Sequence, residues 1–201
     1  MNVSLFDYGT GNLHSLEKAL EAYGARVRVE DEPTAVLDAD AMVLPGVGAF
    51  GAAAARLDGA RDEIVAALQG GFPCLGICLG MQLLFAESEE SPGRGLGFVE
   101  GRVRRLRAHR VPQMGWNEVE IETAHRDPLF ASTSDPIVYY ANTYVAEPRS
   151  REDVIGWTTF EDDRFAAAVR KGNVWGVQFH PEKSAGVGLR MLRNFLSEVT
   201  P

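Results

Sequence analysis

The sequence Pro73-Cys74-Leu75-Gly76-Ile77-Cys78-Leu79-Gly80-Met81-Gln82-Leu83-Leu84-Phe85 contains the change of pattern that decides the fold. It opens with the apolar run 74–77, which is typical of a strand buried on both faces of a parallel sheet. The pattern then changes to helical spacing, with Leu79, Gln82, Leu83 and Ala86 on neighbouring turns. This stretch therefore predicts a buried strand, a sharp turn at Cys78 and a helix.

Cys78 occupies the predicted turn, with one glycine two residues before it and another two residues after it. Gly76 and Gly80 have no Cβ, so the backbone can turn tightly and pack closely there. The pattern is that of a nucleophile elbow with cysteine as the nucleophile, at a helix N-terminus that favours the thiolate. A buried cysteine in an ordinary strand-to-helix turn is the alternative, and these residues alone leave both interpretations open.

A histidine and a glutamate close to the other end of the chain supply the groups that a cysteine nucleophile needs. Pro181 disfavours the helical region for His180, so we expect the backbone there to be extended. Residues two apart in an extended segment project to the same side, so Glu182 can hold one imidazole nitrogen while the other faces a nucleophile. Cys78, His180 and Glu182 are therefore the predicted catalytic triad.

The first half of the chain alternates between buried strands and helices, which predicts a doubly wound α/β domain. The expected strands are 3–6, 27–29, 41–44 and 74–77. The expected helices begin near Leu13, Pro33, Arg61 and Leu79, and Gly24 is expected at the C′ position of the first.

Strand-like runs dominate the second half, at 98–106, 119–121, 137–140, 154–160, 165–170 and 174–179. Gly172-Asn173 predicts a hairpin between the last two, and a final helix is expected from a Ser184 N-cap to Val199. We therefore expect a three-layer α/β fold in one domain, residues 1–201. Its central sheet is mostly parallel and flanked by helices, with antiparallel strands in the C-terminal half.

Composition excludes several classes of function. The 201 residues carry 20 basic and 28 acidic side chains, a net charge of −8, so neither nucleic acid nor an anionic membrane is an expected partner. Cys74 and Cys78 are the only cysteines, which favours a reducing, cytoplasmic location. No apolar run approaches the length of a membrane span, the N-terminus lacks a signal-peptide pattern, and no spacing predicts a metal site. Cys74 is expected to be a core residue only.

Two glycine-containing loops follow predicted strands. The loop 7–12 resembles the start of a dinucleotide fingerprint, but His14 stands where the third glycine belongs, so NAD binding is not predicted. The loop 45–51 can aim backbone N–H groups at a phosphate or an oxyanion, or it can be a plain turn. A local basic patch is interpreted as a solvated strand face or a protein contact; it comprises Arg102, Arg104, Arg105, Arg107 and Arg110.

The motifs around the predicted triad together resemble those of the class I (triad) glutamine amidotransferases. The two that carry this resemblance are 76–82 (Gly-Ile-Cys-Leu-Gly-Met-Gln) and 179–182 (Phe-His-Pro-Glu). Three further stretches, 7–13, 45–50 and 112–117, are similar to the glutaminase subunits of imidazole glycerol phosphate synthases. Most relatives in the wider family carry a second glycine in the oxyanion loop, where this sequence and that subfamily have Val47.

The resemblance implies hydrolysis of L-glutamine to glutamate and ammonia, without a cofactor. It implies that Cys78 attacks the amide carbon, that His180 moves the protons and that Glu182 orients the imidazole. The oxyanion hole is expected from the backbone at Leu79, Val47 and Gly48. The residues expected to hold the substrate are Gly46, Gln82, Thr143 and Tyr144.

The resemblance also implies a partner that uses the ammonia, a (β/α)₈-barrel cyclase that makes imidazole glycerol phosphate and AICAR. The positions that match the family's interface are Asn12, Trp116, Tyr139 and Lys183. A large anchor beside Gly115 suits an interface, although Trp116 can equally be a core tryptophan. Three alternatives stay open: a glutaminase for another biosynthetic pathway, a catalytically silent regulatory subunit on the same fold, and a stand-alone cysteine hydrolase.

Overall fold

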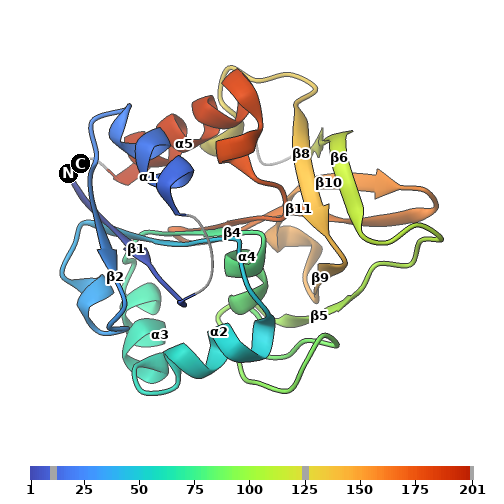
Figure 1. The fold of residues 1–201 in the computed structure, drawn as a ribbon. Coiled ribbons are helices and arrows are strands. Elements are labelled where there is room, and N and C mark those ends of the chain that lie inside the picture. Colours follow the sequence, from blue (N-terminus) through green and yellow to red (C-terminus); the bar gives the residue numbers. More distant parts are fainter. Residues whose placement is uncertain (10–12, 124–126, 200–201) are drawn as a thin grey trace.

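A computed structural model describes residues 1–9, 13–123 and 127–199. Within these residues, eight strands form a central sheet in the order β2-β1-β3-β4-β12-β11-β10-β7 (Figure 1). Pairing is parallel from β2 to β12 and antiparallel from β12 to β7. The strands are β1 (Asn2–Phe6), β2 (Arg26–Glu30), β3 (Ala41–Leu44), β4 (Cys74–Ile77), β7 (Glu120–Ile121), β10 (Val154–Phe160), β11 (Asp163–Lys171) and β12 (Val174–Val177). The predicted fold class is confirmed.

Helices cover both faces of the sheet and complete the three layers (Figure 1). On one face lie α1 (His14–Glu21) and α5 (Ala185–Val199); on the other lie α2 (Phe50–Leu57), α3 (Arg61–Gln69) and α4 (Leu79–Leu83). Short 3-10 turns are η1 (Ala35–Leu37), η2 (Pro128–Phe130), η3 (Arg151–Asp153) and η4 (Pro181–Lys183). No helix in the described ranges is long and apolar enough to cross a membrane.

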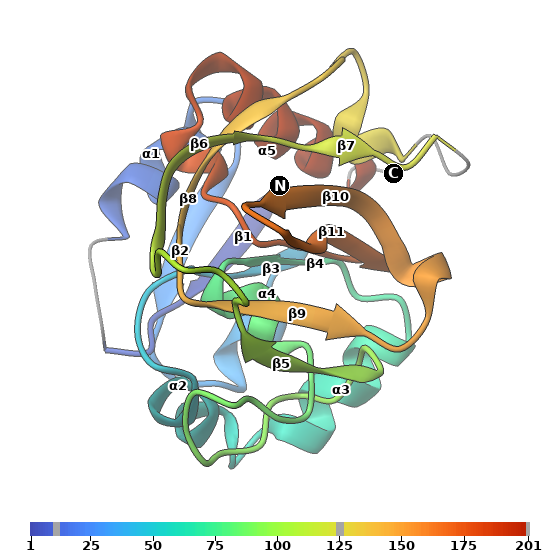
Figure 2. The same cartoon turned by 90° about the vertical axis from the view of Figure 1, so that its right-hand side faces the viewer.

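Two additional antiparallel ribbons flank the C-terminal half of the sheet. One pairs β5 (Gly101–Arg105) with β9 (Tyr144–Pro148), and the other pairs β6 (Gln113–Glu118) with β8 (Ile137–Asn142). Figure 2 shows them on opposite sides of the central sheet, with β6 and β8 on the side of α5 and with β5 and β9 on the side of α3. The β6–β8 ribbon thus extends the helical layer that contains α1 and α5.

Successive side chains along the central strands point to opposite faces of the sheet, so the hydrophobic core consists of two clusters, one on each face. In β3, Ala41 and Val43 pack in the cluster beneath α1 and α5, whereas Met42 and Leu44 pack in the cluster with α2 and α3. All four residues of β3 are buried, as are all four of β4 and of β12. Both faces must therefore be apolar, which explains the continuous hydrophobic runs in the sequence.

The turn from β4 into α4 depends on unusually close backbone packing. A Cβ on Gly80 would overlap the carbonyl oxygen of Leu44 at the end of β3. A Cβ on Gly76 would lie 2.6 Å from the carbonyl oxygen of Gly80. Glycine is therefore required at both positions so that β3, β4 and α4 can approach one another.

Most strands match the prediction, and those at 41–44, 74–77 and 154–160 have the expected bounds. Gly172 adopts a positive φ of 60° between the antiparallel β11 and β12, as the predicted hairpin requires. Gly24, with φ of 87°, ends the first helix: its N–H donates to Glu21, and that of Ala25 donates to Leu20. This is the expected C′ geometry.

The predicted helix through Ala86 is wrong, because α4 ends at Leu83 and the N–H groups of Leu84 and Phe85 bond only three residues back. The strand expected from Phe98 begins only at Gly101. Sequence analysis also missed α2, β6 and β9 as elements. The buried residues of α2 do have helical spacing, but two of the four are small alanines; they are Phe50, Ala53, Ala54 and Leu57.

The predicted basic patch is largely paired with acidic groups rather than free in solvent. Arg104 is 4% exposed and makes two hydrogen bonds, of 2.7 and 2.8 Å, to the carboxylate of Asp163. Arg102 and Arg104 both contact Glu147 across the β5–β9 ribbon. The interpretation as a solvated face is therefore wrong for Arg104, whose role is to join β5 to β11.

The packing of Gly80 predicts a large effect of a single methyl group. We expect Gly80→Ala to lower the free energy of unfolding by about 3 kcal/mol, because the added Cβ must separate β3 from α4. Gly186→Ala in α5 is the matched control, since a Cβ there meets nothing within 4 Å. Denaturant unfolding of both variants measures the difference, and equal stabilities would contradict the packing argument.

Candidate active site

Cys78 lies at the junction of β4 and α4 in a strained backbone conformation. Its φ is 48° and its ψ is −102°, a region that residues with a Cβ rarely adopt. Its N–H donates to the carbonyl oxygen of Val177 at 2.7 Å, which ties the turn to the end of β12. Leu79 follows as the first residue of α4, so its N–H belongs to the helical turn that has no acceptor within the helix. This is the geometry of a nucleophile elbow.

His180 and Glu182 form a hydrogen-bonded pair at the carboxyl end of β12. His180 Nδ1 lies 2.8 Å from Glu182 Oε1, and the histidine is 3% exposed. His180 is extended, with φ of −101° and ψ of 97°, as Pro181 predicts. The expectation that this extension continues to Glu182 is wrong, because η4 begins at Pro181. The 3-10 turn itself brings the carboxylate to the ring.

The structure brings Cys78 against the same histidine. Gly46 lies beside both side chains: a Cβ on it would be 2.9 Å from Cys78 Cβ and 2.9 Å from His180 Cε1. Burial lowers the pKa of His180, but the interactions with Cys78 and Glu182 outweigh burial and raise it to about 9. The three predicted triad residues therefore form one continuous array.

The backbone of His180 is held by β8. Its N–H donates to the carbonyl oxygen of Tyr139 at 2.8 Å. Ser184 Oγ accepts from the N–H of Tyr139 at 2.9 Å and donates to the carbonyl oxygen of His180 at 2.6 Å. Ser184 was expected to cap α5, and its hydroxyl instead bridges β8 to the histidine loop. Sequence spacing could not reveal this role, because Tyr139 is 45 residues away.

The loop that precedes α2 completes the rim of the site. Gly48 has a φ of 116°, and Val47 beside it is half-buried. Two residues that sequence analysis missed fix the start of α2. Glu90 Oε2 accepts from the N–H of Phe50 at 2.6 Å, and Ser91 Oγ accepts from that of Gly51 at 2.9 Å. The loop that leads into α2 is therefore anchored at its far end.

The residues expected to hold the substrate are partly engaged with one another. Gln82 is 5% exposed, and its Nε2 donates to the carbonyl oxygen of Tyr144 at 3.0 Å. The same Nε2 donates to Oε1 of Gln178 at 3.3 Å, and Gln178 Nε2 donates to Cys78 Sγ at 3.5 Å. The carbonyl oxygen of Thr143 accepts from Leu106. Gln178 was not among the predicted site residues, although it lies two positions before His180.

Three of the four residues expected at a partner interface lie on the β6–β8 ribbon and the adjoining turn η4. Trp116 on β6 is 55% exposed and packs edge-on against Tyr139 of β8, with ring centroids 6.0 Å apart. Met114 and Ile137 on the same ribbon are 67% and 56% exposed, and Lys183 in η4 is also exposed. The alternative of a core tryptophan at Trp116 is wrong. Asn12 lies outside the described residues.

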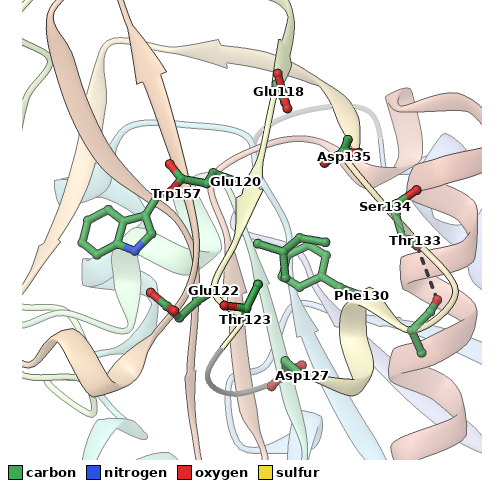
Figure 3. A pocket seen from close by; sticks show the side chains of 12 residues that line it. Glu118, Glu120, Glu122, Thr123, Asp127, Phe130, Thr133, Ser134, Asp135 and Trp157 are labelled. Atoms are coloured by element: carbon green, nitrogen blue, oxygen red, sulfur yellow. Dashed lines mark hydrogen bonds between the residues drawn. The ribbon is translucent and has the colours of Figure 1, made fainter.

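A cavity of about 650 Å³ lies elsewhere, beside β7, β10 and η2 (Figure 3). Its lining is acidic and surrounds Phe130, with Trp157 on one side; the carboxylates are Glu118, Glu120, Glu122, Asp127 and Asp135. Asp127 is already bound to Arg170 and to the indole N–H of Trp175. None of the predicted site residues lines this cavity.

Comparison with known proteins agrees with this geometry. Residues 4–199 match the family described as glutamine amidotransferase class-I, and the chain belongs to that family. It is 44% identical to the imidazole glycerol phosphate synthase subunit HisH of Gloeobacter violaceus, over 97% of this chain and 88% of that protein. It is 43% identical to the protein of the same name from Methanothermobacter thermautotrophicus, over 96% of this chain and 97% of that protein.

Solved structures show the same fold at lower sequence identity. The structure titled PurLQS from Thermotoga maritima superposes with a TM-score of 0.78 at 19% identity and covers 99% of each chain. One titled simply a glutamine amidotransferase gives 0.76, also at 19% identity and 99% of each chain. The architecture around the elbow is therefore shared well beyond the range of close sequence similarity.

The raised pKa of His180 predicts a measurable dependence on Cys78. In the wild-type protein we expect the imidazole to stay protonated up to about pH 9. Since the folded-state pKa exceeds the ordinary value, protonated His180 stabilises the fold fully below about pH 6.5, and this contribution is lost as the pH rises through 9. Cys78→Ala removes one of the two partners that raise the pKa of His180. The titration midpoint of His180 should therefore fall, which NMR of the imidazole signals can follow. An unchanged midpoint would refute the pairing.

Proposed function

We propose that this chain is the glutaminase subunit of an imidazole glycerol phosphate synthase. It hydrolyses L-glutamine to glutamate and ammonia in histidine biosynthesis. The observation that carries the proposal is the buried Cys78–His180–Glu182 array. The family membership and the relatives named HisH support the choice of glutamine as substrate and of this pathway.

The reaction begins with attack of the Cys78 thiolate on the side-chain amide carbon of glutamine. A C–S bond forms and the carbonyl oxygen becomes an oxyanion. The backbone N–H of Leu79 and one N–H from the loop at Val47 and Gly48 stabilise that charge. Removing one such donor typically costs on the order of 3 kcal/mol of transition-state stabilisation. The N-terminus of α4 adds a favourable dipole.

Proton transfer then falls to His180. Since its pKa is about 9, the imidazole carries a proton at neutral pH and can give it to the leaving nitrogen. The C–N bond breaks, ammonia leaves, and a γ-glutamyl thioester remains on Cys78. His180 next accepts a proton from water, the resulting hydroxide attacks the thioester, and glutamate is released with the thiolate restored. Glu182 holds the ring by Nδ1 throughout.

Substrate binding is proposed for the residues around the elbow. Gly46 leaves room beside Cys78 and His180 for the amide group, since any side chain there would occupy that space. Gln82, Thr143 and Tyr144 are proposed to hold the rest of the glutamine molecule. The buried Gln82 is well suited to that role, because its amide is already oriented by the Tyr144 carbonyl.

The ammonia is proposed to pass to a (β/α)₈-barrel cyclase subunit in a heterodimer, located in the cytoplasm. Ammonia released into water would be protonated and diluted, so a shielded interface preserves it. The exposed apolar side chains of the β6–β8 ribbon support docking there: Met114, Trp116 and Ile137. Tyr139, Lys183 and Asn12 are proposed to contribute to the same interface.

Control of the glutaminase is proposed to lie at Val47. A β-branched residue restricts the loop more than glycine would, so its N–H adopts the productive direction only when the partner's substrate binds. The isolated chain is then almost inactive. Full glutaminase activity of the isolated chain would exclude this form of control.

Substitution of the triad tests the catalytic assignment. In the presence of the cyclase, we expect Cys78→Ala and His180→Ala to reduce glutamate production by at least about a thousandfold. Glu182→Gln should lose less, because it keeps an orienting group while losing the charge. Near-normal activity of Cys78→Ala would show that Cys78 is not the nucleophile.

Substitution of Trp116 tests the interface. We expect Trp116→Ala to weaken association with the cyclase by about 2 kcal/mol or more, since exposed tryptophans are frequent hot spots. The matched control is Tyr23→Ala, which removes another exposed aromatic side chain at the end of α1. Titration calorimetry gives the affinity, and the ratio of glutamine used to synthase turnover reports leakage of ammonia. Unchanged affinity together with unchanged coupling would refute the docking surface.

A further inference from the structure

Gln178 contacts the proposed nucleophile Cys78 from the end of β12, the strand that pairs in parallel with β4, and it is not one of the triad residues. Its side chain is completely buried, directly after β12 and two residues before His180. Its Nε2 donates to Cys78 Sγ at 3.5 Å, within the range for a hydrogen bond to sulfur. One segment therefore supplies both Gln178, which donates a hydrogen bond to Cys78, and His180, whose imidazole lies beside Cys78 at Gly46.

The direction of the Gln178 amide is fixed by its other contact. Gln82 Nε2 donates to the backbone carbonyl oxygen of Tyr144, which can only accept, so the nitrogen end of Gln82 must face that side. The same nitrogen donates to Gln178 Oε1. Because the oxygen of Gln178 is thus turned to Gln82, its NH₂ group must face the sulfur. The hydrogen bonds of Gln82 therefore determine which end of the Gln178 amide is oxygen and which is nitrogen.

We infer that Gln178 is a positioning residue that holds the Cys78 sulfur as a thiolate aimed at the substrate. A buried anion needs donors, and a neutral N–H supplies one without taking the proton that His180 must later deliver. The titratable group against the thiol is His180, and Glu182 lies behind it on η4; Gly46 faces Cys78 from the oxyanion loop without a charge. This inference rests on the proposed glutaminase function.

A role in packing alone makes a different prediction from a role in hydrogen bonding. Gln178→Met keeps much of the volume and removes the donor. Gln178→Glu keeps the shape, can still accept from Gln82, and directs a carboxylate at the sulfur. If Gln178 only fills space, Gln178→Met should leave the reactivity of Cys78 unchanged; if it stabilises the thiolate, Gln178→Met should slow the reaction of Cys78 and Gln178→Glu should slow it further.

The test is the rate of alkylation of Cys78 by iodoacetamide from pH 6 to 9, in the complex with the cyclase. Cys74 is completely buried, so we expect it to react slowly. The Cys78→Ala variant measures the alkylation that does not come from Cys78. We expect Gln178→Met to slow alkylation at pH 7 about fivefold, as for the loss of one hydrogen bond, and to shift the profile to higher pH. Glutaminase kcat should fall with little change in KM, and Gln178→Glu should lose more.

The matched control is Ser4→Ala, because Ser4 is a completely buried polar residue in β1, a strand that pairs with neither β4 nor β12. We expect the wild-type pH profile from it, and thermal unfolding verifies that all variants fold. A wild-type alkylation profile and kcat in Gln178→Met would overturn the inference, as would a milder loss in Gln178→Glu. Failure of the proposed function looks different: wild-type Cys78 would alkylate normally while glutamine stayed intact.

Discussion

The backbone of Cys78, held at a φ of 48°, is the constraint on which the rest of the site depends. Such a conformation costs of order 1–3 kcal/mol, so the surrounding structure must enforce it. Gly76 and Gly80 let β3, β4 and α4 close around the turn, and the bond from Cys78 N–H to Val177 fixes it to β12. The strain turns the Cys78 side chain out of line with β4, a strand whose four residues are all buried.

The segment that follows β12 carries nearly everything that acts on this thiol. Within seven residues, Gln178 reaches the sulfur, His180 pairs with it, Glu182 orients the ring, and Ser184 fastens the histidine to β8. A short rigid segment positions these groups more accurately than separate loops would. The same segment is hydrogen-bonded to the β6–β8 ribbon at Tyr139, whose backbone bonds to both His180 and Ser184.

Local patterns were enough to predict most of the central strands, the elbow and the pairing of His180 with Glu182, because each is encoded within a few residues. The contact between Gln178 and Cys78 joins positions 100 residues apart and follows from the parallel register of β4 with β12. No local spacing specifies that register. The role of Ser184 was predicted wrongly for a similar reason. A serine that precedes a helix resembles an N-cap, and only the fold shows that its hydroxyl group bonds to the backbone of Tyr139 and of His180.

The parallel pairing of β12 with β4 has a consequence for synthesis of the chain. Among the described strands, β12 is synthesised after all the others, and until it is made, β4 is the open edge of the sheet β2-β1-β3-β4. That edge is apolar and unprotected, so an incomplete chain is prone to associate with its neighbours. The same order of synthesis leaves Cys78 without His180 and Glu182 until β12 has been made, because both residues follow that strand in the chain.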